Sequence, residues 1–172
     1  KIIGTNTLAL NQCILIMGVS GSGKTTIGKL LAKETGGTFL DADDLHPAMN
    51  ILKMKQGFSL SDGDREPWLD KITLAIHKYR EQQPLIIACS ALKTSYRDKI
   101  GLHHYKLVYL KGSQFQISKR IAKRENHFMS PTLLDSQFND LEEPADALTI
   151  SISRPPDEII RTILEKLITP DL

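Results

Sequence analysis

A glycine-rich segment near the start of the chain has the residue types and spacing of a phosphate-binding loop. Residues 18–25 read Gly-Val-Ser-Gly-Ser-Gly-Lys-Thr and fit the pattern G-x-x-x-x-G-K-[ST] at every fixed position. Glycines let backbone N–H groups turn inward around phosphate oxygens, and the helix that follows points its positive end at them. Lys24 is expected to reach the β- and γ-phosphates of ATP, and the Thr25 hydroxyl is expected to hold Mg²⁺.

The context of this loop favours a nucleotide site over an ordinary glycine-rich turn. The apolar run at residues 13–17 predicts a buried strand before the loop, and the spacing of Ile27, Leu30 and Leu31 predicts a helix over residues 24–35 after it. The predicted nucleotide contacts are Gly18, Val19, Ser20, Gly21, Ser22, Gly23, Lys24, Thr25 and Thr26. GTPase switches and ATPases use the same loop, so the rest of the chain must decide the reaction.

Acidic residues follow the second predicted strand, residues 38–40. In an open parallel sheet, ligands bind outside the carboxyl ends of the strands, which puts Asp41, Asp43 and Asp44 beside the phosphate loop. One carboxylate could hold Mg²⁺ through water, and another could orient the attacking hydroxyl and accept its proton. Helix capping explains Asp44 at least as well. The third predicted strand ends in Ser90 rather than in an acid, so the metal-handling role falls to Asp41 and an ATPase motor is disfavoured.

Strand and helix patterns alternate along the chain. Further strands are predicted at residues 84–89, 105–110 and 147–152, and helices at 47–57, 67–82, 114–124 and 155–168. An arm at residues 126–143 carries its own helix near Pro131. This alternation predicts an α/β fold with a parallel sheet and right-handed crossovers. With no repeat and no long linker, residues 1–172 are expected to form a single domain.

Composition narrows the possible partners. Lys and Arg number 22 against 20 Asp and Glu, a net charge of +2, so a nucleic-acid partner is not expected. No apolar run is long enough for a membrane span, and a cytoplasmic location is the expectation. Cys13 and Cys89 both lie in apolar runs, which favours two buried thiols over a disulfide or a zinc site.

Several blocks beyond the phosphate loop resemble the gluconokinase family. They are LDADDLHP at 40–47, CSALK at 89–93, YRD at 96–98, HFM at 127–129 and SQF at 136–138. The resemblance runs from about Ile14 to the last helix. It implies ATP-dependent phosphorylation of D-gluconate at its 6-hydroxyl, and usually a homodimer. It also implies a three-layer P-loop NTPase fold with five parallel strands, a substrate-binding segment at about 44–68 and a mobile lid at about 125–143.

The resemblance extends to the roles of the acids. By similarity to shikimate kinase, whose second strand ends in a like Asp-x-Asp, Asp41 is expected near Mg²⁺ and Asp43 facing the substrate hydroxyl. Gluconate is an anionic polyol, so its site needs a cation and several hydrogen-bonding groups. Arg97 suits the carboxylate because a planar guanidinium matches it bidentately. Arg65 ranks below Arg97, since neighbouring acids are close enough to occupy it.

Other basic residues are candidates for the same cleft. Further substrate contacts are expected from His46, Lys53, Lys93 and His127. Each has a structural alternative. His46 could instead be a helix-entry residue positioned by Pro47, and Lys93 could be a solvated side chain at a helix start. His127 could be only a hinge residue.

Three arginines are candidates for the nucleotide. Arg120 and Arg124 lie one helical turn apart just before the lid and are expected to stabilise the transferring phosphoryl group, although such pairs also form solvated faces. Arg154 follows the fifth predicted strand and could stack on the adenine.

Two alternatives to a gluconokinase stay open at this point. Another kinase of the same fold would act on shikimate or on a nucleotide. A nucleotide-dependent switch would hydrolyse slowly without an acceptor, and the sequence offers no interaction tail or repeat for it.

Overall fold

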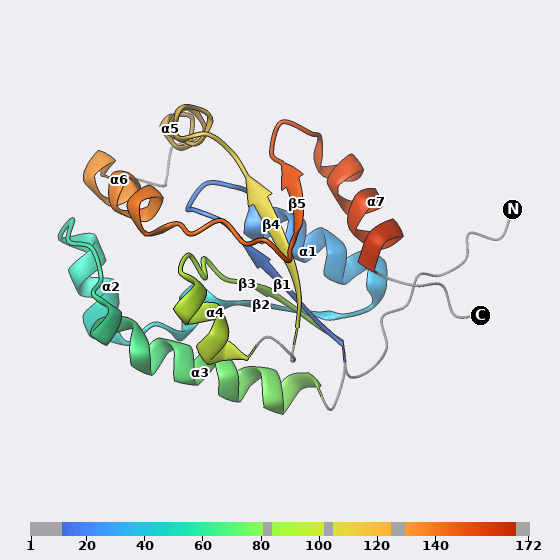
Figure 1. Ribbon diagram of the computed structural model, residues 1–172, viewed down its shortest axis with the longest axis horizontal. Helices are drawn as coiled ribbons and strands as arrows, with labels where there is room; N and C mark the ends of the chain where they lie inside the picture. Colours follow the sequence, from blue (N-terminus) through green and yellow to red (C-terminus); the bar gives the residue numbers. More distant parts are fainter. Residues whose placement is uncertain (1–11, 81–83, 102–104, 125–129, 168–172) are drawn as a thin grey trace, which may run out of the picture.

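The computed structural model describes residues 12–80, 84–101, 105–124 and 130–167. One sheet of five parallel strands runs through its centre in the order β2-β3-β1-β4-β5 (Figure 1). The strands are β1 Cys13–Met17, β2 Thr38–Asp41, β3 Leu85–Ala88, β4 Lys106–Lys111 and β5 Leu148–Ser151. The central strand β1 pairs on both sides, so that Leu15 lies between Ile87 and Leu107. The predicted α/β fold with a five-stranded parallel sheet is confirmed.

Helices cover both faces of this sheet, which makes three layers (Figure 1). Helices α1 Lys24–Thr35 and α7 Pro156–Leu167 pack on one face, where Ile14 and Ile16 join their core. Helices α3 Asp62–Arg80 and α4 Thr94–Ile100 pack on the other face, against Leu15 and Met17. All five residues of β1 are buried because alternate side chains enter the two cores, which explains its uninterrupted apolar run.

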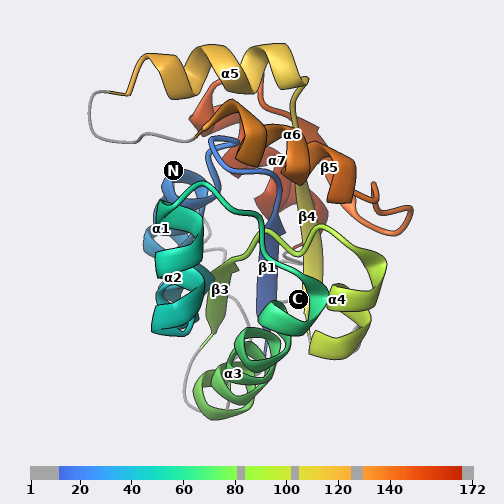
Figure 2. The ribbon, with the colours of Figure 1, turned by 90° about the vertical axis from the view of Figure 1, so that its left-hand side faces the viewer.

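The remaining helices gather around the carboxyl end of the sheet (Figures 1 and 2). They are the 3-10 turn η1 Ala42–Leu45 and the helices α2 Ala48–Lys55, α5 Gln114–Ala122 and α6 Pro131–Asp140. Helices α5 and α6 lie side by side across this end, joined by a hydrogen bond from Gln114 to Asp135 (Figure 2). Side chains cap both helices: Ser113 forms a capping box with Gln116, and Ser130 accepts from the Leu133 amide.

Two differences from the predicted elements have local causes. Helix α3 begins at Asp62 instead of residue 67, because Ser61 and Asp64 cap its start reciprocally: the Ser61 hydroxyl accepts from the Asp64 amide at 3.1 Å, and the Asp64 carboxylate accepts from the Ser61 amide at 2.8 Å. Apart from the helix start considered at Lys93, no predicted element covers helix α4. It is a short helix, and Arg97 ties its first turn to the preceding loop.

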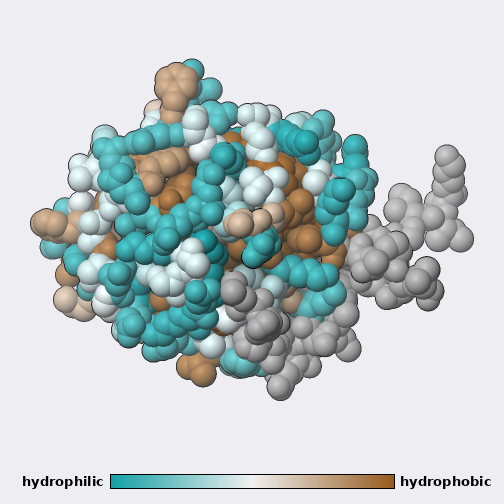
Figure 3. Space-filling model, viewed as in Figure 1, coloured by the Kyte–Doolittle hydropathy of each residue, from teal (hydrophilic) through white to brown (hydrophobic). Residues whose placement is uncertain are grey.

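The face of the molecule in Figure 3 is mainly hydrophilic and the two cysteines are buried, as the composition and the apolar runs predict. Figure 3 shows hydrophilic side chains over most of one face, with smaller hydrophobic patches between them. Within the described ranges, no helix combines the length and the apolar character needed to cross a membrane. Neither Cys13 nor Cys89 forms a disulfide and both are buried, as predicted, and burial raises the pKa of the Cys89 thiol to about 12.

Candidate active site

The loop between β1 and α1 leads into a helix start with open backbone donors. Gly21 and Gly23 have φ values of +82° and +98°, a region that side chains with a Cβ rarely adopt, so the loop requires glycine at both positions. No side chain caps the first turn of α1. The N–H groups at this helix start are therefore available to an anion such as a phosphate.

Lys24 and Thr25 stand where the loop enters α1. The Lys24 ammonium donates to the Val19 carbonyl at 3.0 Å. Burial lowers the pKa of Lys24, and the charges of Asp43 and Asp41 act against this shift. The Thr25 hydroxyl donates to an Asp41 carboxylate oxygen at 3.2 Å, across 16 residues of sequence.

This hydroxyl and carboxylate form an oxygen pair that fits Mg²⁺. The ion usually takes one or two protein oxygens and completes its shell with water and substrate phosphates. Within the described residues, no cluster of three or more His, Cys, Asp or Glu side chains could hold a metal by itself. Thr25 and Asp41 are therefore suited to an ion that arrives with a nucleotide.

Asp43 is held in the turn η1 by two contacts. Its backbone amide donates to Asp41 Oδ1 at 3.0 Å, and the preceding residue, Ala42, accepts a hydrogen bond from the Trp68 indole at 2.7 Å. Partial desolvation of the Asp43 carboxyl at the cavity wall raises its pKa, while the nearby Lys24 charge lowers it and Asp41 raises it further. A carboxylate with a raised pKa beside a phosphate loop can accept a proton from a hydroxyl.

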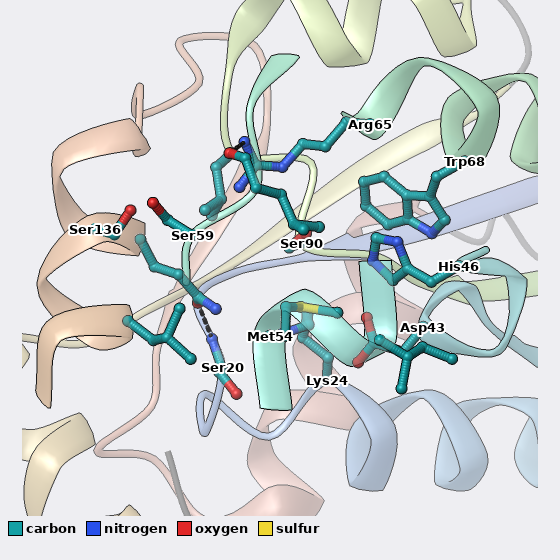
Figure 4. A pocket seen from close by; sticks show the side chains of 15 residues that line it. Ser20, Lys24, Asp43, His46, Met54, Ser59, Arg65, Trp68, Ser90 and Ser136 are labelled. Atoms are coloured by element: carbon teal, nitrogen blue, oxygen red, sulfur yellow. Dashed lines mark hydrogen bonds between the residues drawn. The ribbon is translucent and has the colours of Figure 1, made fainter. Parts of the chain in front are cut away.

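A cavity of about 240 Å³ joins Asp43 to the phosphate loop (Figure 4). Its lining is Ser20, Lys24, Asp43, His46, Ile51, Met54, Ser59, Leu60, Arg65, Trp68, Ser90, Leu92, Leu133, Ser136 and Gln137. These residues come from the phosphate loop, from η1 and the residue after it, from α2, α3 and the loop between them, from the segment after β3, and from α6. The volume and the mixture of serines with charged groups suit a small polar molecule.

His46 lies in this cavity as a neutral ring. It stacks on Trp68 with ring centroids 4.3 Å apart and an interplanar angle of 10°. The Asn50 amide donates to His46 Nδ1 at 3.2 Å, which leaves the proton of the neutral ring on Nε2. Burial, with a smaller contribution from the Arg65 charge, lowers the pKa of His46 to about 4. The ring can therefore donate one hydrogen bond to a substrate hydroxyl near neutral pH.

Arg65 lines the cavity on the side away from Lys24 (Figure 4). Its guanidinium donates to the Leu60 carbonyl at 2.8 Å and to the Tyr96 hydroxyl at 2.9 Å, and it pairs with Asp140 at 3.4 Å. Asp62 and Asp64, the neighbouring acids that were close enough in sequence to occupy Arg65, bind Lys93 and Lys53 instead. Of the described residues that line the cavity, Lys24 and Arg65 carry the positive charges.

Arg97 has a different position from the one expected for a carboxylate ligand. Its side chain is 3% exposed and does not line the cavity. It donates to the carbonyls of Ala91, Leu92 and Glu142 at 2.7, 3.1 and 3.0 Å, and to the Thr94 hydroxyl at 3.1 Å. With its donors engaged in this way, Arg97 holds the segment after β3 to the segment after α6, and the predicted substrate contact does not fit this placement.

The two predicted lysine contacts are also engaged outside the cavity. Lys53 pairs with Asp64 at 2.6 Å, and Lys93 pairs with Asp62 at 3.0 Å. Neither lysine lines the cavity, so a direct contact with a substrate there does not fit their placement. Both pairs brace the start of α3, which carries Arg65.

The predicted nucleotide arginines lie around the phosphate loop. Arg120 donates to the Ser22 carbonyl at 3.5 Å and to the Ile152 carbonyl at 2.5 Å, which joins the loop to the segment after β5. Arg124 is exposed, and its charge contributes to lowering the pKa of Lys24. Arg154 is exposed and contacts the Thr162 hydroxyl at 3.4 Å. His127 and the start of the expected lid, residues 125–129, lie outside the described residues.

Several cavity residues were not among the predicted site residues. Trp68 and Gln137 are the clearest, because Trp68 stacks on His46 and Gln137 accepts a hydrogen bond from the Ser20 amide. Gln137 lies in SQF at 136–138, one of the blocks that resemble the gluconokinases. Trp68 lies in the apolar stripe of the helix predicted at 67–82, and packing in the core explains a tryptophan there without a site. SQF lies in the predicted arm, and the sequence does not show where that arm packs.

The geometry defines the class of the protein. A carboxylate that shares a small cavity with an open phosphate loop is arranged to direct a small acceptor at a nucleotide, and the chain is therefore a P-loop kinase of small molecules.

Comparisons with known proteins identify the branch of this class. The family model described as shikimate kinase matches residues 20–167. Gluconokinase from Arabidopsis thaliana is 43% identical over 172 residues, which cover 90% of this chain and 91% of the relative. Thermosensitive gluconokinase from Escherichia coli K12 is 46% identical over 77% of this chain and 73% of its own length. The chain belongs to the shikimate kinase family and, within it, to the gluconokinases.

Solved structures agree with this placement. The crystal structure of a gluconokinase from Sinorhizobium meliloti 1021 superposes with a TM-score of 0.82 at 36% identity, covering 94% of this chain and 95% of that one. A shikimate kinase from Aquifex aeolicus, with a TM-score of 0.59 and 16% identity, shares the fold.

Proposed function

We propose that this chain is a gluconokinase, which transfers the terminal phosphoryl group of ATP to the 6-hydroxyl of D-gluconate. The observation that carries the proposal is the cavity that Lys24 of the phosphate loop and Asp43 share. The identity of the acceptor is supported by gluconokinase relatives that are 41–46% identical over most of the chain.

The charges of the cavity suggest how gluconate is oriented. We assign the gluconate carboxylate to Arg65, in place of Arg97, because a guanidinium at the end away from Lys24 would draw the anionic end of the substrate there. The hydroxyl at the other end of the molecule would then approach Asp43. His46 and the serines of the lining are suited to hydrogen bonds with the hydroxyls between.

The reaction needs a proton acceptor and a stabiliser of phosphate charge. Asp43 orients the 6-hydroxyl and takes its proton as the new O–P bond forms and the bond to the ADP oxygen breaks. Lys24 and the loop amides stabilise the charge on the transferring group. Mg²⁺ held near Thr25 and Asp41 would neutralise charge on the phosphate oxygens when it is bound.

The finer parts of the proposal are supported mainly by the family resemblance. They are the use of Mg²⁺, contacts of Arg120 and Arg124 with the phosphates, stacking of Arg154 on adenine, closure of a lid at about 125–143, a homodimer and a cytoplasmic location. The position of Arg120 against the phosphate loop adds support for the first arginine. Closure would exclude the water that otherwise hydrolyses ATP.

ADP release with and without gluconate tests the function directly. We expect release to depend on gluconate, with one 6-phosphogluconate formed per ADP. Shikimate and nucleoside monophosphates in the same assay cover the other kinases of this fold. Faster release with one of them than with gluconate, or slow release independent of any acceptor, would overturn the proposal.

A further inference from the structure

Helix α6 contacts the phosphate loop through one side chain. The Ser20 backbone amide donates to Gln137 Oε1 at 2.7 Å, a bond between residues 117 positions apart (dashed at Ser20 in Figure 4). Both residues line the cavity that also contains Lys24 and Asp43. The bond therefore joins the phosphate end of the cavity to α6, which forms another part of the cavity wall.

The same helix contacts the acceptor end of the cavity one turn later. Asp140 is three residues beyond Gln137, so the two side chains lie on neighbouring positions of the α6 surface. The Asp140 carboxylate pairs with Arg65 at 3.4 Å and approaches the Lys93 ammonium at 4.0 Å. The Arg65 side chain is only 12% exposed, so this pair is better shielded from water than an ordinary surface ion pair.

The end of α6 is fixed to the rest of the domain. The Glu142 amide donates to the Leu92 carbonyl at 2.8 Å, its carbonyl accepts from Arg97 at 3.0 Å, and its carboxylate accepts from the Thr94 amide at 3.2 Å. These bonds anchor the helix just after its last turn. Besides the bond between Asp135 and α5, the Gln137 bond is a further attachment, one that reaches the phosphate loop.

We propose that Gln137 is a positioning residue for the acceptor: it ties α6 to the phosphate loop, and α6 in turn holds Arg65, through Asp140, in place for the substrate carboxylate. The inference rests on the proposed function, since it takes Arg65 as the carboxylate ligand. With the tether cut, α6 keeps its bond to α5 and its anchor at Glu142 but loses its attachment to the phosphate loop, and the Asp140 carboxylate then holds the guanidinium less firmly. A misplaced cation weakens binding of the anionic acceptor and leaves the phosphate contacts of the loop in place.

Steady-state kinetics of Gln137→Ala, Asp140→Asn and the double variant test this link. Each single variant is expected to raise KM for gluconate about tenfold while KM for ATP changes less than about twofold. Because both changes interrupt the same link, the double variant should also show an increase of about tenfold. A roughly hundredfold increase would mean independent contacts and would overturn the proposal, as would equal effects on both KM values.

Asn139→Ala is the matched control, because Asn139 is exposed on the same helix between the two contacts. It should leave both KM values unchanged; a Gln137→Ala variant that behaves like it contradicts the tether. If Gln137→Ala does not fold, Asp140→Asn alone still has to raise KM for gluconate without changing KM for ATP.

Hydrogen exchange of the protein without ligands separates this inference from the proposed function. Amides of α6 should exchange faster in Gln137→Ala than in wild type or Asn139→Ala, while amides of α1 keep their protection. Unchanged α6 exchange refutes the tether even where gluconate is the substrate. Wild-type protein that fails to phosphorylate gluconate refutes the proposed function, and the exchange result still decides whether the tether exists.

Discussion

The two ends of the cavity are built in different ways. The phosphate end comes from one continuous stretch, β1, its loop and the start of α1, with Asp41 added from the neighbouring β2. The acceptor end draws on η1, α2, α3, the end of β3 and α6, which span nearly a hundred residues of sequence. The first end depends on backbone geometry and the second on side chains whose partners lie far away. We therefore expect substitutions at the phosphate end to affect turnover, and those at the acceptor end to affect substrate affinity or stability.

Two arginines show what this difference means in practice. Arg97 lies in the YRD block and Arg65 lies near the start of α3, and both side chains are largely buried. Arg97 donates to three carbonyls of the loops around it, whereas Arg65 lines the cavity and is held by Asp140. The two residues are of the same type. The protein groups within hydrogen-bonding distance of each guanidinium decide which of the two can bind a ligand.

The largest effect is expected from Lys24→Met. The variant lacks the cation at the phosphate end, so kcat should fall on the order of 10³-fold, measured as gluconate-dependent ADP release. Lys33→Met is the control, because Lys33 is exposed in the last turn of α1. Near-normal turnover of Lys24→Met would contradict the role of the loop.

Asp43→Asn tests the acid at the border between the two ends. Loss of the proton acceptor should lower kcat on the order of 10²-fold and leave KM for ATP within about threefold. Asp44→Asn, the neighbouring exposed acid, provides the comparison. Equal losses in turnover and in ATP affinity would give Asp43 a structural role instead.

Arg65→Met should mainly change affinity for the acceptor. Without the guanidinium, KM for gluconate is expected to rise about 30-fold, equivalent to about 2 kcal/mol for a charge-assisted hydrogen-bonded pair, while KM for ATP stays nearly constant. Lys53→Met serves as the control for loss of a nearby positive charge, since Lys53 is engaged with Asp64 outside the cavity. If the two variants have the same KM for gluconate, Arg65 is not the carboxylate ligand.

Arg97→Met should instead lower stability. The substitution leaves the carbonyls of Ala91, Leu92 and Glu142 without their donor, at a cost of about 3 kcal/mol, which corresponds to a decrease in Tm of roughly 10 °C for a domain of this size. Thermal unfolding measures this change. A stable Arg97→Met variant with a strongly raised KM for gluconate would exchange the roles assigned to the two arginines.

The smallest effect concerns the pH dependence of stability at His46. Its pKa of about 4 in the folded protein lies below the usual value of 6.5, so the unfolded chain binds more protons between these values. Stability should therefore rise as pH increases from about 4 to 6.5, with His46 contributing about 1–2 kcal/mol after allowance for solvent screening. Denaturant unfolding across this range should show a shallower rise in His46→Asn; parallel curves would contradict the shift.

Much of the architecture could be predicted because its determinants are local. The buried run of β1, the apolar stripe of α1 and the glycines of the loop each specify their own conformation. The start of α3 could not be predicted from its proline, because the reciprocal cap between Ser61 and Asp64 competes with that signal. Helix α4 is too short to show a clear period.

For the site, the sequence by itself determined the phosphate loop, the neighbouring acids and the family to which they belong. These features depend on residue type at fixed spacing, and a loop of glycines followed by Lys24 forms the same donor arrangement wherever it stands between a strand and a helix. Tertiary structure alone decided that Arg65 rather than Arg97 faces the cavity and that Gln137 reaches Ser20. A side chain's function there depends on which partners the fold leaves within hydrogen-bonding distance, and those partners are up to 117 residues away.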